Sequence, residues 1–165
     1  MREILFRGKP VNKAIYTNFE KKFKNASFFS NGFVFGSLVI YENKYYICLN
    51  IKLNMSGIIF NSNESNMTAT MIEVIPETVG QFTGLTDKNG KKIFEGDVLR
   101  AAYQPEQDVI IEWSDGSFRF RRADKPKDYV YCNIRYIQNA VGRLKIIGNI
   151  YDNPELLKGI KNVQL

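Results

Sequence analysis

The sequence contains no histidine among its 165 residues. This absence excludes Ser-His-Asp and Cys-His catalysis, zinc sites with histidine ligands, and a histidine pH switch. Cysteine is nearly absent too, at two residues, which cannot build a disulfide framework. Cys48 and Cys132 each lie in an apolar, strand-like stretch, so we expect two small packed side chains.

Long hydrophobic runs are also missing. No apolar stretch approaches the ~18 residues of a membrane-spanning helix, and residues 1–7 lack the ~7–15-residue apolar segment of a signal peptide. We therefore expect a cytoplasmic protein with no membrane partner. There is no Gly-rich phosphate loop and no Cys-x-x-Cys pair, so the sequence predicts no cofactor and no metal.

The residues that are present are typical of a globular chain. Hydrophobic residues make up 44% and charged residues 24%, and aromatics are abundant, with 12 Phe and 9 Tyr. A chain of this length buries roughly 70% of its unfolded surface. Disorder, collagen and coiled coil are therefore excluded as descriptions of the whole chain.

Short β-branched and aromatic runs between turn residues predict a mainly β fold with minor helix. The expected hairpins of the first half pair residues 33–41 with 45–49, and 57–60 with 71–75. Thr17 and Glu20 have the spacing of a capping box that begins a short helix. Pro76 should end the strand pairing, so we predict two domains, a hairpin-rich β domain over 1–78 and a second domain over 79–165.

The second domain contains several short strands joined by tight turns, which favours a small β-barrel. Phe118 and Phe120 alternate with Arg119 and Arg121, so we expect the Phe rings inside and the Arg side chains outside. Asn153 before Pro154 is typical of a helix start, and a short C-terminal helix should follow.

A turn motif stands in the middle of the chain. We expect backbone turn roles for its members, which are Gly84, Asp87, Asn89, Gly90, Gly96 and Asp97. Lys92 and Val98 stand where a calcium-binding loop needs Gly and Glu, which excludes that loop. Glu95 and Asp97 flank a glycine and are an alternative carboxylate pair, although no third ligand stands nearby.

The net charge is +6, from 23 basic and 17 acidic residues, which raises the hypothesis of a nucleic-acid partner. The candidate binding residues are Arg119, Arg121, Arg122, Lys125 and Lys127. They could follow a phosphate backbone while Phe118 and Phe120 stack on bases. The strand alternation argues against the stacking, because the Phe rings face away from Arg119 and Arg121.

Three long motifs cover much of the chain: residues 75–85 (IPETVGQFTGL), 87–98 (DKNGKKIFEGDV) and 147–157 (IGNIYDNPELL). Together with residues 2–8 and 35–38 they resemble the YopX family of phage and prophage proteins. The resemblance implies a phage or prophage origin and a small SH3-like barrel in the second half. It implies no activity, so there are no catalytic residues to carry over.

We therefore expect a non-enzymatic accessory or interaction protein that acts inside the bacterial host. Exposed strand edges and many aromatics favour self-association into a homo-oligomer, or binding to a host or phage protein. The alternative hypothesis is a nucleic-acid-binding protein that uses the basic strand face around residues 119–127.

Overall fold

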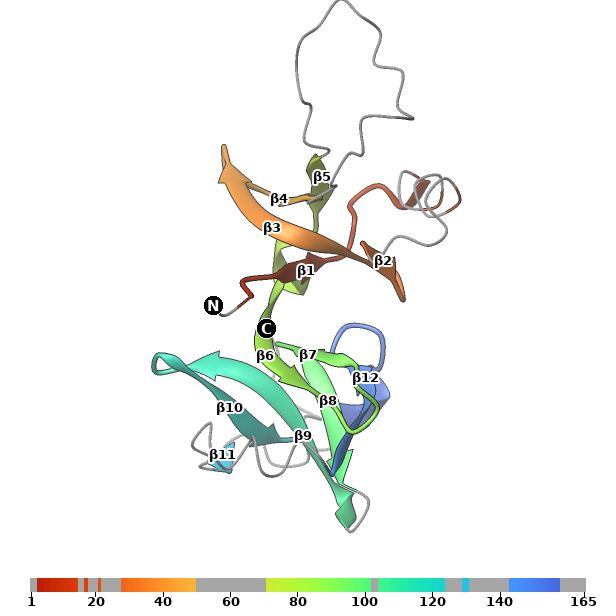
Figure 1. Cartoon of the computed structure of the whole chain (residues 1–165), viewed down its shortest axis with the longest axis vertical. Coiled ribbons are helices and arrows are strands. Elements are labelled where there is room, and N and C mark those ends of the chain that lie inside the picture. The colour runs from red at the N-terminus through yellow and green to blue at the C-terminus, as the bar shows by residue number, and fades with distance from the viewer. Residues whose placement is uncertain are drawn as a thin grey trace, which may run out of the picture. The chain divides into compact units, whose positions relative to one another are not determined.

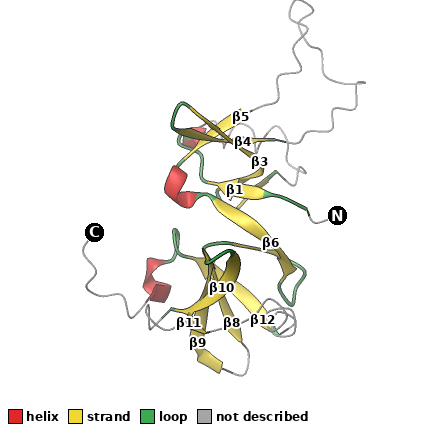
Figure 2. Ribbon diagram, turned by 90° about the vertical axis from the view of Figure 1, so that its left-hand side faces the viewer, coloured by secondary structure: helices red, strands yellow, loops and turns green. Residues whose placement is uncertain are grey.

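Figure 1 shows the computed structural model of the whole chain. The structure describes residues 3–14, 17, 21, 28–49, 71–101, 104–123, 129–130 and 143–157. The chain divides into two compact units, one of residues 5–79 and one of residues 1–4 with 80–165. The described strands belong to two antiparallel sheets, and Figure 2 shows how strands dominate both units. The expectation of a mainly β fold is confirmed, whereas the two domains over 1–78 and 79–165 stay a prediction.

The strands of the unit of residues 5–79 close on themselves. Their order is β5 (Met71–Val74), β4 (Lys44–Cys48), β3 (Phe33–Tyr41) and β1 (Phe6–Gly8), with β2 (Phe29–Ser30) beside β3. After β1 the chain crosses to the far edge of β5. There the Val11 amide donates to the Glu73 carbonyl at 3.0 Å, and the Ile75 amide donates to the Lys9 carbonyl at 2.8 Å. Residues 9–11 therefore satisfy an edge that would otherwise be open.

Two tight turns in this unit have positive φ at both central residues, the backbone that suits a two-residue hairpin. They are Asn31-Gly32, with φ of 52° and 77°, and Glu42-Asn43, with φ of 49° and 60°. The second joins β3 to β4, as expected. The first joins β2 to β3, where the sequence analysis expected no strand, although Asn-Gly is a strong hairpin signal.

The expected partner of residues 71–75 was also different. Residues 57–60 lie outside the described part of the chain, and β5 pairs with β4 instead, with Ile47 opposite Ile72. The 3-10 turn η1 (Pro76–Thr78) follows β5, so Pro76 ends the pairing as predicted. The hydroxyl of Thr78 holds this turn to the chain after β1, because it accepts from the Lys9 amide at 2.9 Å.

The other unit is built on a five-stranded sheet curled into a half-barrel. Its order is β11 (Tyr129–Val130), β10 (Ser117–Arg122), β9 (Gln104–Ser114), β8 (Asp97–Ala101) and β12 (Leu144–Asn149). The long arc of β9 is visible in Figure 1. The register shifts between Leu99 and Ala101 and between Ile146 and Gly148, and such irregularities bend a sheet and increase its twist. The hairpin of β6 (Gly80–Thr86) and β7 (Lys92–Phe94) belongs to the same unit.

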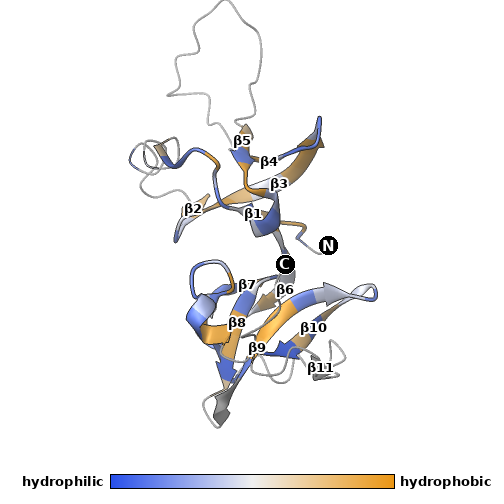
Figure 3. Ribbon diagram, turned by 180° about the vertical axis from the view of Figure 1, so that it is seen from behind, coloured by the Kyte–Doolittle hydropathy of each residue, from blue (hydrophilic) through white to orange (hydrophobic). Residues whose placement is uncertain are grey.

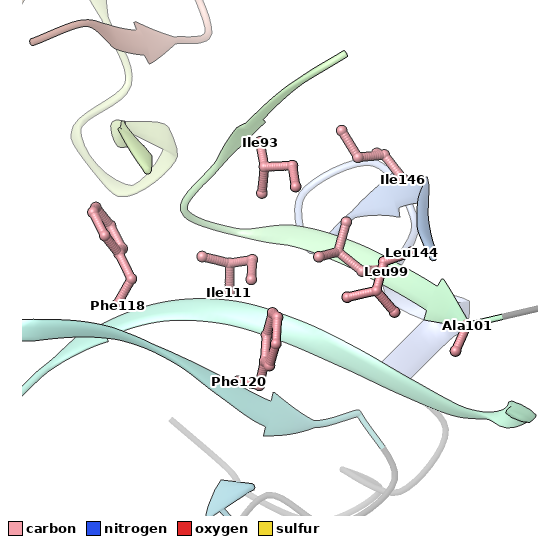
Figure 4. Close-up of a cluster of buried hydrophobic side chains, with 8 residues drawn as sticks. All are labelled: Ile93, Leu99, Ala101, Ile111, Phe118, Phe120, Leu144 and Ile146. Carbon is pink, nitrogen blue, oxygen red and sulfur yellow. The ribbon is translucent and has the colours of Figure 1, made fainter. Parts of the chain in front are cut away.

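Hydrophobic side chains lie on both faces of this sheet, and the ribbon of Figure 3 is coloured as hydrophobic in the middle of β8 and β9. Figure 4 shows the larger cluster, which contains Ile93, Leu99, Ala101, Ile111, Phe118, Phe120, Leu144 and Ile146. Val98, Ile110 and Ala123 form the core of a smaller cluster with side chains of β12 and of the residues that follow it. Phe118 and Phe120 are each 3% exposed, so their predicted inward direction is confirmed.

The helices are smaller than the sequence predicted, and the described residues contain no complete α-helix. The expected C-terminal helix is a 3-10 turn, η2 (Pro154–Leu157). Lys13, Ala14, Thr17 and Lys21 have helical backbone. The predicted capping role of Thr17 is wrong: Asn12 accepts from the Ala14 amide at 3.0 Å, while the Thr17 hydroxyl donates to the Lys13 carbonyl at 3.1 Å.

Candidate functional site

The basic strand face lies on β10, and alternation divides its members. Arg119 and Arg121 point to the face opposite Phe118 and Phe120, as predicted. Arg122 is the next residue along and falls on the Phe side, because β10 pairs with β9 without a register shift. Lys125 and Lys127 lie outside the described residues. The structure therefore brings together two of the five candidate residues.

These two arginines contact carboxylates. Arg119 lies 2.7 Å from Asp115 and Arg121 lies 2.6 Å from Glu112. On β8, which lies beyond β9 in the same sheet, Arg100 donates two hydrogen bonds of 2.7 Å to the two oxygens of Asp108. The hydrogen bond to Asp108 raises the pKa of the Arg100 guanidinium. Positive charge on this face is thus balanced locally, which reduces the electrostatic attraction available to a phosphate backbone.

The turn motif serves the fold. The Asp87 side chain is 5% exposed and accepts three backbone amides: Asn89 at 2.8 Å, Lys91 at 3.0 Å and Ile146 at 3.1 Å. Burial alone would raise the pKa of Asp87, but the hydrogen bonds from these amides and the charge of Lys91 outweigh burial and lower it. One carboxylate thus fastens the β6–β7 turn to β12.

Three glycines of the motif have the expected positive φ, which is 87° at Gly84, 79° at Gly90 and 81° at Gly96. At Gly96 a side chain would also collide with the ring of Tyr151, 2.9 Å from the position of a Cβ. In the β6–β7 turn Gly90 supplies the positive φ, while the Asn89 amide donates to Asp87.

The alternative carboxylate pair is divided between two backbone amides. Asp97 is 2% exposed and accepts the Phe94 amide at 2.9 Å, which holds the β7–β8 turn. Glu95 accepts the Trp113 amide at 3.3 Å. This contact lies next to the hydrogen bond that the Gly96 amide donates to the Ile111 carbonyl of β9. Across the described ranges, no three acidic or cysteine side chains are grouped so as to hold a metal ion.

The surface feature that sequence reasoning missed is a hydrophobic one. On the outside of the unit of residues 5–79, large apolar side chains project from β3, β4, β5 and the segment that follows β1. We call this surface the apolar outer face and define it by Val11, Val39, Tyr41, Tyr46, Met71 and Ile75. Val39 of β3 lies opposite Tyr46 of β4, and Tyr46 lies opposite Glu73 of β5. On the other side of β5, the Val11 amide donates to the Glu73 carbonyl.

Four of the seven large hydrophobic side chains that are exposed among the described residues belong to this face. Tyr41 is 63% exposed, Val11 55%, Met71 54% and Ile75 37%. Their strand neighbours Ile47, Ile72 and Val74 point inward and are at most 3% exposed. A contiguous exposed apolar surface of this kind is typical of a binding site.

A signal for this face was present in the sequence. A strand with one solvent-exposed face alternates apolar and polar residues. In residues 33–41, by contrast, the side chains that point to either face are apolar, apart from Gly36 and Ser37. Such a run indicates a strand that is covered on both sides. The same run also predicts the strand itself.

None of the helices in the described ranges is long and apolar enough to cross a membrane.

Comparison with known proteins finds a matching family and related proteins. The family model described as YopX protein matches residues 37–158. The SPbeta prophage-derived uncharacterized protein YopX of Bacillus subtilis (strain 168) is 29% identical over 75 residues, which cover 44% of this chain. The chain spans about half the length of that relative, 54%. Among solved structures, protein EF1440 from Enterococcus faecalis is 31% identical, with a TM-score of 0.38, over 57% of this chain and 72% of that one.

Proposed function

This chain belongs to the YopX family, and from that premise we propose that it is a non-enzymatic phage or prophage accessory protein that works in the host cytoplasm by binding a second copy of itself. The observation that carries the proposal is the apolar outer face, four of whose six side chains are between 37% and 63% exposed. Keeping such a surface in water is unfavourable, and covering it yields roughly 25 cal/mol per Å².

The low net charge of the apolar outer face lets a second copy bind there and gives a strongly charged partner little to attract it. Two molecules of net charge +6 repel each other at long range. A face that binds its own copy must therefore carry little net charge. The apolar outer face meets this condition, because the Lys44 and Glu73 side chains beside it have opposite charges and lie 3.5 Å apart.

The non-enzymatic part of the proposal is supported by what the carboxylates do. Asp87 and Asp97 are almost fully buried and accept backbone amides, which is a structural use. For the second unit we propose an SH3-like barrel. Its support is the curled five-stranded sheet together with the β6–β7 hairpin, whose Leu85 and Ile93 pack into the same core.

The test is sedimentation velocity of the full chain from about 1 to 100 μM, a range that brackets the affinity of many transient complexes. We expect dimers that dissociate on dilution. The double variant Tyr41→Ser, Met71→Ser should weaken the dimer at least about tenfold, because each lost contact at an interface centre costs on the order of 1 kcal/mol.

The matched control is Ile4→Ser, which removes a side chain of 67% exposure from the other unit and should leave the dimer unchanged. All the substituted side chains are exposed, so the variants should fold normally. A single species at monomer mass over the whole concentration range would overturn the proposal.

A further inference from the structure

The two charged side chains beside the apolar outer face point to the symmetry of the contact. Lys44 begins β4 and stands opposite Tyr41, whereas Glu73 lies on β5 opposite Tyr46. Their side chains are 56% and 38% exposed, and the contact between them is long, at 3.5 Å to either carboxylate oxygen. An exposed pair of this geometry is weak within one chain, so both groups remain available to a partner.

A two-fold interface brings the same surface of both copies together, so it must be complementary to itself. A face with charges of one sign would repel its own copy, whereas a face with one cation and one anion can form the same ion pair twice. Among the described residues, Lys9 is the other lysine near this face, and its ammonium lies 5.2 Å from the centre of the Phe33 ring. Lys44 and Glu73 are therefore the pair best placed to cross the axis.

We propose that the apolar outer face meets the same face of a second copy around a two-fold axis, and that Lys44 of each copy pairs with Glu73 of the other. This inference rests on the proposed function, because it specifies the geometry of the same self-association. The apolar side chains supply the affinity, and the two exchanged ion pairs fix the orientation of the copies.

Two charge-reversal variants of the full chain test the geometry, Lys44→Glu and Glu73→Lys. Each variant alone carries like charges at both crossing positions, so we expect each to lose dimer affinity by about tenfold or more. Mixed in equal amounts, they should form a one-to-one heterodimer, since every crossing contact is then between opposite charges. The double variant Lys44→Glu, Glu73→Lys should dimerise with itself like the original chain.

Native mass spectrometry and sedimentation velocity read the outcome directly. The matched control is the exposed Lys92–Glu3 pair, at 2.7 Å in the other unit: Lys92→Glu and Glu3→Lys should each behave like the unaltered chain. If the unaltered chain is a monomer, the proposed self-association fails. If it dimerises but mixing the reversed variants restores nothing, the self-association stands and the two-fold pairing of Lys44 with Glu73 is wrong.

Discussion

At the scale of single residues, Asp87 shows how one buried carboxylate can accept hydrogen bonds from several backbone amides. It gathers amides from its own turn and from β12, which lies far along the chain. Because these bonds favour the charged form, they lower the pKa of Asp87 despite its burial. Hydrogen bonds from backbone amides therefore offset the unfavourable free energy of burying the carboxylate, and the same amides need no water as a partner.

We expect Asp87→Asn to lower the free energy of unfolding at pH 7 by about 1–3 kcal/mol, because the amide group places a donor against backbone donors. The folded pKa lies below the ordinary value of 3.8. The carboxylate thus stabilises the fold above pH 3.8, and this contribution is lost as the pH falls through the folded pKa.

Urea unfolding of both chains between pH 7 and pH 2 checks this prediction, and the difference in stability should shrink only in the acid range. Glu77→Gln is the control, since Glu77 is an exposed carboxylate in η1 and its replacement should change stability little at any pH. A difference that stays constant down to pH 2 would mean that Asp87 acts by packing and not by charge.

At the scale of secondary-structure elements, Gly36 is the corner of the small closed sheet. Strand β3 pairs with β4 from Ser37 onward and with β1 up to Gly36, so it changes partners at this residue. A Cβ built on Gly36 would lie 2.0 Å from the carbonyl oxygen of Cys48, which is backbone. Glycine is required here because two strands approach more closely than any side chain permits.

Gly36→Ala should therefore destabilise the unit of residues 5–79 by about 2 kcal/mol or more, since backbone must move to admit the methyl group. The urea midpoint of the full chain, followed by the far-ultraviolet signal, measures the effect. Ser30→Ala, at an exposed strand position of the same unit, serves as the control and should stay within about 0.5 kcal/mol. Equal midpoints for the two variants would show that β3 can relax around the corner.

The elements also show what the sequence could and could not predict. Strand alternation in residues 117–122 was enough to place Phe118 inside and Arg119 outside, because side-chain direction follows from a local period of two. The partner of β5 and the return of residues 9–11 to its edge are long-range pairings, which no local pattern encodes. The carboxylate that pairs with Arg121 was equally hidden, since it depends on the register between β9 and β10, whereas Asp115 lies only four residues before Arg119.

At the scale of the whole molecule, net charge and local charge give different expectations for the affinity to nucleic acid. The chain carries +6, yet Arg100, Arg119 and Arg121 each lie within 2.7 Å of a carboxylate. A phosphate backbone would have to compete with these acids. Nucleic-acid binding through residues 119–127 therefore stays an alternative. It predicts tight binding to nucleic acid, whereas a neutralised face predicts weak binding.

With a neutralised face, we expect affinity for single-stranded DNA, duplex DNA and RNA in the weak non-specific range, with a Kd of about 10⁻⁴ M at physiological salt. The double variant Glu112→Gln, Asp115→Asn frees Arg121 and Arg119, so it should bind more tightly and with a steeper salt dependence. Fluorescence anisotropy with labelled oligonucleotides at two salt concentrations measures both quantities. Submicromolar binding by the unaltered chain, with a salt slope that falls by about one when Arg119 is lost, would instead make these arginines a phosphate-binding surface. In that event the acids would position the guanidinium groups, because an ion pair can hold an arginine in place as well as neutralise it.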